Sequence, residues 1–95
     1  MKKLVVLGAG ESGVGAAILG KQKGYNVFVS DKGAIAKKYK KVLLNNEIDW
    51  EEGKHTLDKI LIADEVIKSP GIADKVELIQ KLKLQNIPVI SEVEF

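Results

Sequence analysis

The residues with the clearest chemical potential are glycines near the N-terminus. Gly8, Gly10 and Gly13 form a G-x-G-x-x-G turn directly after an apolar run at residues 4–7. Such a turn between a strand and a helix offers free backbone N–H groups and the positive end of a helix dipole to a phosphate. Asp31 follows a second apolar run, about twenty residues beyond the glycines, where nucleotide-binding α/β units keep a ribose or base acceptor. The spacing predicts a site for a nucleotide diphosphate and leaves the nucleotide open.

Backbone amides are expected to be the main phosphate ligands of this turn. All 15 positively charged residues are lysines, so the chain lacks the planar guanidinium fork that binds a phosphate through two parallel hydrogen bonds. The N–H groups of Gly10, Glu11, Ser12 and Gly13 would supply most of the contact, with the Ser12 hydroxyl as a further donor. The Glu11 carboxylate disfavours a crowded dinucleotide pyrophosphate. The alternative is a tight turn that needs glycine only for its backbone geometry.

Two further segments are expected near the same site. Asp31 would accept hydrogen bonds from a ribose hydroxyl or a base N–H and exclude a 2′-phosphate, although the neighbouring Lys32 could admit one. Asp31 could also simply end its strand at a solvated turn. In the segment Ser69-Pro70-Gly71, proline restricts the chain, glycine allows close approach of a ligand, and serine offers a hydroxyl. A plain turn is the alternative for this segment. His55, followed by Thr56, could line the rim of the same edge, although a plain surface position is the main expectation.

Alternating strand and helix patterns position these residues. They predict an α/β fold: a Rossmann-like, doubly wound parallel sheet of about five strands flanked by helices. Right-handed crossovers then bring the ends of the first, second and fourth strands to one edge of the sheet, where ligands bind. Thr56 is expected to cap a brief helix, Gly24 to end the first helix, and Val76 to be buried in the last one. The expected strands are 3–7, 26–30, 49–52, 65–68 and 88–90, and the expected helices are 11–24, 34–45, 57–60 and 73–85.

Composition excludes several functional classes. The 95 residues suffice for one domain, and a net charge of +2 creates no strong field for nucleic acid or an acidic membrane surface. Cysteine is absent, which excludes disulfides and thiolate chemistry and fits a reducing cytoplasm. No apolar run approaches the length of a membrane span, and the single histidine has no partner for a metal. Without a phosphate-binding loop for ATP and magnesium or a paired nucleophile and base, we expect the chain to bind and not to turn over.

The combined motifs resemble those of a known family. Over essentially all 95 residues the chain is similar to the N-terminal domain of the Mur ligases, and within them to the branch that adds D-glutamate during peptidoglycan synthesis. The motifs that carry the resemblance are Leu7-Gly8-Ala9-Gly10-Glu11-Ser12-Gly13, Ser30-Asp31, Ser69-Pro70-Gly71-Ile72 and Ser91-Glu92-Val93-Glu94-Phe95.

The resemblance implies a UDP site without NAD. Backbone N–H groups of Glu11, Ser12 and Gly13 would meet the diphosphate, Asp31 and Lys32 would face the uridine, and Ser69 and Gly71 would close the other side. Family members often carry a basic or polar residue where this chain has Gly33, so a side-chain contact to the nucleotide at that position is in doubt.

The resemblance also implies a longer enzyme. Residues 1–95 would be the first of three domains and would hold UDP-N-acetylmuramoyl-L-alanine, while ATP and magnesium would act in a central domain and D-glutamate would sit on a third. We expect a cytoplasmic monomer whose partners are the other domains of the same ligase, with no nucleic acid and no membrane. Two alternatives are a stand-alone module that senses NAD, with Asp31 on the adenosine ribose, and an interaction domain that has lost its ligand.

Overall fold

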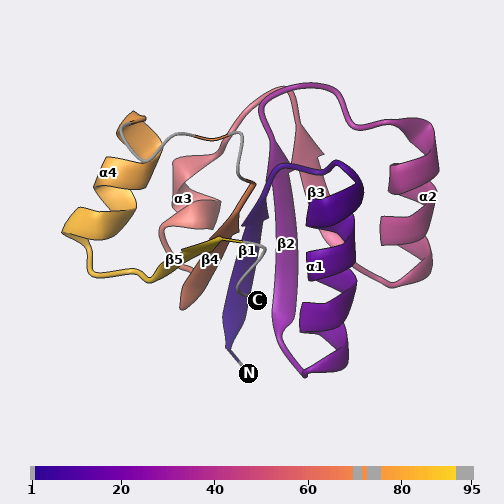
Figure 1. Cartoon of the computed structure of the whole chain (residues 1–95), viewed down its shortest axis with the longest axis horizontal. Helices are drawn as coiled ribbons and strands as arrows, with labels where there is room; N and C mark the ends of the chain where they lie inside the picture. Colours follow the sequence, from indigo (N-terminus) through magenta and orange to yellow (C-terminus); the bar gives the residue numbers. More distant parts are fainter. Residues whose placement is uncertain (1, 70–71, 73–75, 92–95) are drawn as a thin grey trace.

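A computed structural model describes residues 2–69, 72 and 76–91 of the chain. Strands and helices alternate along it, as the sequence predicts (Figure 1). The strands are β1 Lys3–Leu7, β2 Asn26–Asp31, β3 Asp49–Glu52, β4 Glu65–Lys68 and β5 Val89–Ser91, and the helices are α1 Glu11–Gln22, α2 Lys37–Asn45, α3 Leu57–Ile60 and α4 Glu77–Leu84.

The five strands form one sheet in the order β3-β2-β1-β4-β5, and every neighbouring pair is parallel. This order is that of a doubly wound fold, with β1 at the centre, and it confirms the predicted fold class. The carboxyl ends of β1, β2 and β4 therefore lie side by side. Any ligand bound at this edge can contact three loops that are distant in sequence.

Helices cover both faces of the sheet, which explains why β1 is apolar at four consecutive positions. Leu4 and Val6 pack into a core with residues of α1 and α2, whereas Val5 and Leu7 pack into a second core with residues of α3 and α4. In Figure 1 the first pair of helices lies to the right of the central strands and the second pair to the left. Each fully buried side chain of this size contributes roughly 1.5–3 kcal/mol to folding.

Several element boundaries differ from the expected ones. Helix α2 begins at Lys37 and not at residue 34, because the chain before it is extended and the backbone N–H of Ile35 donates to Glu52. Helix α4 begins at Glu77, so Val76 is its exposed N-cap and not a buried helical residue; residues 73–75 lie outside the described part. The expectation for Gly24 is confirmed: it directly follows the C-cap of α1 with φ +93°.

Candidate functional site

The three glycines of the turn differ in conformation and surroundings. Gly8 has φ +101°, a conformation that L side chains rarely adopt. At Gly13 an added Cβ would lie 1.9 Å from the carbonyl oxygen of Gly8, so helix α1 approaches the turn as closely as it does only because this residue has no side chain. A Cβ at Gly10 would meet no atom within 4 Å. Gly8 and Gly13 therefore shape the turn, and Gly10 leaves open space beside it.

The N-terminus of α1 carries free backbone donors. Gly10 is its N-cap residue without a side-chain cap, and the first backbone hydrogen bond of the helix runs from Val14 N to Gly10 O at 2.9 Å. Within the described ranges, no acceptor faces the N–H groups of Glu11, Ser12 and Gly13. These donors and the helix dipole suit an anion.

Asp31 holds the turn in place from the end of β2. Its Oδ2 accepts a hydrogen bond from Ala9 N at 2.8 Å, and its Oδ1 accepts one from Gly33 N at 2.9 Å. The residue is thus more than a solvated strand end, because it ties β2 both to the glycine turn and to the loop that follows it. Each carboxylate oxygen can still accept a second hydrogen bond from a ligand.

A cavity of about 700 Å³ lies at this edge of the sheet. Its volume is within the range of small-molecule sites. The lining residues come from the loops after β1, β2, β3 and β4 and from the start of α4: Gly8, Asp31, Lys32, Gly53, Lys54, His55, Ser69, Ile72, Val76, Glu77 and Leu78. The loops after four different strands therefore converge on one hollow.

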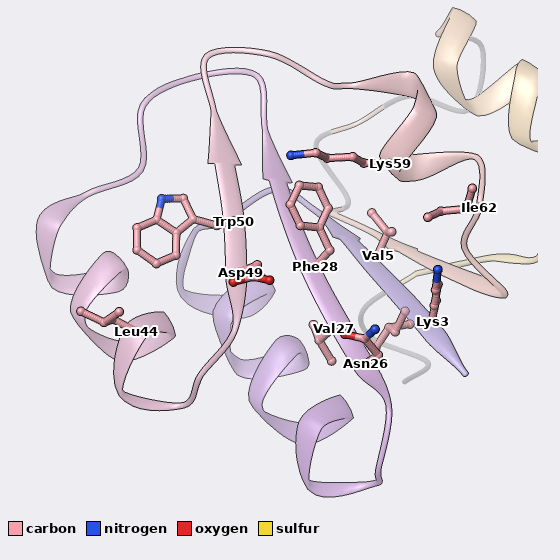
Figure 2. A pocket seen from close by; sticks show the side chains of 11 residues that line it. Lys3, Val5, Asn26, Val27, Phe28, Leu44, Asp49, Trp50, Lys59 and Ile62 are labelled. Carbon is pink, nitrogen blue, oxygen red and sulfur yellow. The ribbon is translucent and has the colours of Figure 1, made fainter. Parts of the chain in front are cut away.

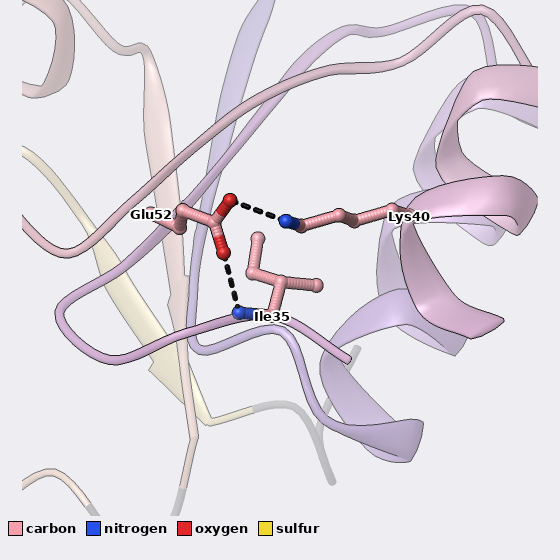
Figure 3. A network of polar contacts seen from close by, with 3 residues as sticks. All are labelled: Ile35, Lys40 and Glu52. Atoms are coloured by element: carbon pink, nitrogen blue, oxygen red, sulfur yellow. Dashed lines mark hydrogen bonds and ion pairs between the residues drawn. The ribbon is translucent and has the colours of Figure 1, made fainter. Parts of the chain in front are cut away.

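The loop between β2 and α2 is fastened to β3. Glu52 Oε1 accepts a hydrogen bond from Ile35 N at 2.9 Å, and its Oε2 forms an ion pair with Lys40 (Figure 3). Gly53 N donates to Gly33 O at 3.0 Å. Hydrogen bonding to Lys40, and then to the Ile35 amide, lowers the pKa of Glu52, so the carboxylate is ionised at neutral pH. These contacts hold the loop that carries Lys32 against the cavity.

Loss of the Glu52 carboxylate is expected to loosen this loop. In Glu52→Ala the Ile35 amide loses its acceptor, and we expect its hydrogen exchange to accelerate about tenfold, the equivalent of one hydrogen bond. Glu52→Gln keeps an oxygen for Ile35 and should change the exchange rate much less. Amide exchange followed by NMR measures both variants, and unaltered protection of Ile35 in Glu52→Ala would contradict the proposed fastening.

A buried polar cluster lies beside the cavity and consists of Ser30, Glu51, His55 and Thr56. Ser30 is 0% and Glu51 7% exposed. Ser30 Oγ lies 2.8 Å from Glu51 Oε2 and 2.7 Å from His55 Nδ1. Glu51 also accepts hydrogen bonds from the backbone N–H of Thr56, at 2.8 Å, and from its hydroxyl. Thr56 is the N-cap residue of α3, as expected, but its side chain binds Glu51 and makes no hydrogen bond to the helix.

The cluster holds one charged and one neutral group at neutral pH. Burial by itself raises the pKa of Glu51, but hydrogen bonds from the Thr56 amide, the Thr56 hydroxyl and the Ser30 hydroxyl outweigh it, so the pKa is lowered overall. Burial lowers the pKa of His55 below its ordinary value of 6.5, against the attraction of Glu51 and Asp31. Glu51 is therefore a carboxylate and His55 a neutral imidazole.

A second hollow, of about 630 Å³, lies around the beginnings of β1, β2 and β3. Figure 2 shows Phe28 and Val5 on the sheet with Lys59 and Ile62 nearby. The Lys59 ammonium is 5.4 Å from the centre of the Phe28 ring. Neither the glycine turn nor Asp31 lines this hollow, so it offers a phosphate none of the amides described above. The cavity at the opposite edge is the better candidate site.

Within residues 2–69, 72 and 76–91, no group of three histidine, cysteine, aspartate or glutamate side chains could hold a metal ion. None of the described helices is both long and apolar enough to cross a membrane.

Comparison with known proteins agrees with the fold. Residues 3–78 match the family model of the MurD N-terminal domain. The chain belongs to this family. It is 62% identical over 95 residues to the UDP-N-acetylmuramoylalanine--D-glutamate ligase of Bacteroides thetaiotaomicron, covering 100% of this chain and 21% of the relative. The corresponding ligase of Christiangramia forsetii is 61% identical over 94 residues, or 99% of this chain and 21% of the relative.

Solved structures support the same fold for this MurD N-terminal domain. A murein peptide ligase from Psychrobacter arcticus superposes with a TM-score of 0.84 at 18% identity, covering 97% of this chain and 19% of that one. At this identity the likeness concerns the fold alone. The chain spans about a fifth of the length of its curated relatives, 21%.

Not all the predicted site residues of the MurD N-terminal domain meet in the cavity. Asp31, Lys32 and Ser69 line it, whereas Glu11 and Ser12 are exposed at the neighbouring N-terminus of α1 together with Gly10. Gly13 is buried against the turn, and Gly71 lies outside the described residues.

Sequence reasoning missed Glu51. For His55 it favoured a surface position over the rim of this sheet edge, whereas the structure places the residue half-buried in the lining of the cavity. The pairing of β2 with β3 sets Ser30 opposite Glu51. A glutamate placed opposite a serine on a buried face was the signal that could have revealed the cluster.

Proposed function

We propose that this chain is the substrate-holding first domain of a ligase that adds D-glutamate to UDP-N-acetylmuramoyl-L-alanine, and that it binds the UDP part of that substrate. The curated relatives bear the name of this ligase. The observation that supports the UDP site is the set of free backbone N–H groups at the N-terminus of α1. They lie next to the cavity that Asp31, Lys32 and Ser69 line.

The diphosphate is proposed to lie against the N-terminus of α1. The N–H groups of Glu11, Ser12 and Gly13 point their dipoles at the phosphate oxygens, and the Ser12 hydroxyl can add a donor. The exposed Glu11 side chain can turn to solvent, so its charge need not face the phosphates. Gly10 lets the phosphates come close to the backbone, because no atom lies within 4 Å of the place of its missing side chain.

The uridine is proposed to occupy the cavity. Asp31 can accept from the nucleoside through lone pairs that Ala9 and Gly33 do not use, and Lys32 lines the same wall. Ser69, which directly follows β4, also lines the cavity, and the role of Gly71 there stays a prediction.

Chemistry with ATP and magnesium belongs in this proposal to parts of the ligase outside this chain, which contributes no catalytic residue of its own. The cysteine-free sequence suits a cytoplasmic enzyme.

Titration of the chain with nucleotides tests this function. By calorimetry or NMR we expect UDP to bind weakly, with a Kd on the order of 0.1–1 mM, because backbone contacts at an open edge must offset the entropy of association. If the site is built for the uridine of the substrate, NAD should bind more weakly than UDP. Tighter binding of NAD than of UDP would overturn the proposal in favour of a dinucleotide sensor.

Two glycine variants locate the diphosphate. Gly10→Val should weaken UDP binding about tenfold or more, because its side chain would fill the approach to the amides, while its Cβ would meet no protein atom within 4 Å. Gly15→Ala, one turn along the same helix and also in open space, should bind UDP like the wild type. Equal affinities for Gly10→Val and the wild type would place the phosphates elsewhere.

A further inference from the structure

We infer that His55 recognises the nucleoside: its neutral ring, held through Nδ1–H by Ser30, presents Nε2 as an acceptor to an N–H or O–H donor in the cavity. This inference deepens the proposed UDP site and rests on it. The contacts within the buried cluster fix the positions of its protons.

The contact between Ser30 and Glu51 has only one possible donor. Their oxygens are 2.8 Å apart, so one proton lies between them. Hydrogen bonds from the amide and the hydroxyl of Thr56 lower the pKa of Glu51 and favour its ionised form, and an ionised carboxylate only accepts. The single hydroxyl proton of Ser30 therefore points to Glu51. The other oxygen near it, the carbonyl of Lys54, is more distant at 3.3 Å.

The contact between Ser30 and His55 must then run in the opposite direction. Ser30 Oγ and His55 Nδ1 are 2.7 Å apart, and the Ser30 proton is already used. Nδ1 consequently carries the ring proton and donates it to Ser30. Since burial favours the neutral ring, Nε2 has no proton and presents a lone pair.

The position of the ring makes this lone pair available to a ligand. His55 lines the cavity together with Asp31 and Lys32, while its Nδ1 faces the buried Ser30. No donor within the described ranges is assigned to Nε2. Glu51 from β3 and Asp31 from β2 favour protonation of the ring, Lys32 opposes it, and Lys54 and Glu77 are the other charged residues lining the cavity.

Both parts of a uridine carry a donor that fits this acceptor. Uracil has an imide N–H, and the ribose has hydroxyl groups. Each carboxylate oxygen of Asp31 already accepts one hydrogen bond, from Ala9 N or from Gly33 N. The lone pair of His55 Nε2 is free for the ligand. Protonation of His55 would turn Nε2 into a donor and remove the match, so UDP affinity should fall as the pH drops through the lowered pKa of the ring.

The tautomer can be read in the free protein. Two-bond ¹H–¹⁵N NMR spectra of the histidine ring should show Nδ1 protonated and Nε2 unprotonated at pH 7.5, and UDP should shift the Nε2 resonance upfield as it accepts a hydrogen bond. A protonated Nε2, or an Nε2 resonance that does not respond to bound UDP, would overturn the inference without touching the proposed UDP site.

Substitution and ligand analogues identify the contact. His55→Phe should weaken UDP binding about tenfold and leave the affinity for inorganic pyrophosphate unchanged. It should also abolish the loss of UDP affinity that the wild type shows as the pH falls through the lowered pKa of the His55 ring. If the uracil imide is the donor, 3-methyl-UDP should bind the wild type about tenfold more weakly than UDP does, and should bind His55→Phe as tightly as UDP does. If a ribose hydroxyl is the donor, 2′,3′-dideoxy-UDP should show this pattern. Equal UDP binding by His55→Phe and the wild type would overturn the role of His55 alone. No UDP binding by the wild type would overturn it together with the proposed function.

Discussion

Gly13→Ala is expected to lower the free energy of unfolding by about 3 kcal/mol or more. The new methyl group would lie 1.9 Å from the Gly8 carbonyl oxygen and 2.9 Å from its carbon, and both atoms belong to the backbone of the turn. Neither can rotate away as a side chain could, so α1 must move off the sheet and the packing of Val14 and Ala17 on the core must loosen. Because small domains are stable by only about 5–15 kcal/mol, this loss is large.

Gly15→Ala is the matched control. Gly15 lies in the same helix, and a Cβ there meets no atom within 4 Å. Alanine is the better helix former, so this variant should be more stable than the wild type by about 0.5–1 kcal/mol. Urea unfolding followed by circular dichroism measures both variants. Equal stability of Gly13→Ala and Gly15→Ala would show that α1 does not depend on its close approach to Gly8.

Removal of the Glu51 carboxylate is the second substitution with a large expected effect. In Glu51→Ala the Ser30 hydroxyl, the Thr56 amide and the Thr56 hydroxyl all lose their acceptor. An unsatisfied buried donor costs about 1–3 kcal/mol, and water entering from the cavity side can rescue part of the loss. We therefore expect a decrease of about 3 kcal/mol in the free energy of unfolding. Glu51→Gln, which keeps one acceptor oxygen, should lose less.

The pH dependence of stability provides an independent check on Glu51. Its pKa in the folded protein lies below the ordinary value of 4.5 that applies to the unfolded chain. A lowered folded pKa means that the unfolded state binds the proton more readily. The ionised Glu51 carboxylate therefore contributes its full stabilisation above about pH 4.5, and this contribution is lost as the pH falls through the folded pKa. Glu52 behaves similarly in both proteins. The difference in unfolding free energy between the wild type and Glu51→Gln should therefore shrink below about pH 4.5, and a constant difference down to pH 3 would contradict the role assigned to the Glu51 charge.

The elements of the fold followed from local patterns. Four consecutive apolar residues at 4–7 indicated a strand covered on both faces, and the structure places two of them in each core. The glycine spacing correctly predicted a strand, a tight turn and a helix. The starts of α2 and α4 were wrong by about one turn. Before α2 a tertiary contact competes with helix formation: the N–H of Ile35 donates to Glu52, on a strand that comes later in the chain, and the next residue, Ala36, is extended.

The candidate site was predictable to a lesser extent. The convergence of Asp31, Lys32 and Ser69 followed from the rule that parallel strands end at one edge, and the cavity brings these three together. The role of Gly13 as a phosphate ligand stays a prediction, and the structure shows a different property, namely that the residue allows the close packing of α1 on Gly8. The ligand contact of Asp31 likewise stays a prediction, and the structure shows Asp31 accepting from the amide of Ala9, 22 residues away in the chain.

The sequence by itself determined where the strands, the glycine turn and the sheet edge lie, because hydrophobic periodicity and glycine act over a few neighbouring residues. Tertiary structure decided which polar groups meet. The register of β2 against β3 sets Ser30 opposite Glu51, and the loop that follows brings His55 to the same hydroxyl. These contacts, of 2.8 and 2.7 Å, join residues that are 21 and 25 positions apart in the chain. They therefore depend on how precisely distant segments are placed against one another. No local pattern encodes the direction of the protons between Glu51, Ser30 and His55, which only their joint geometry sets.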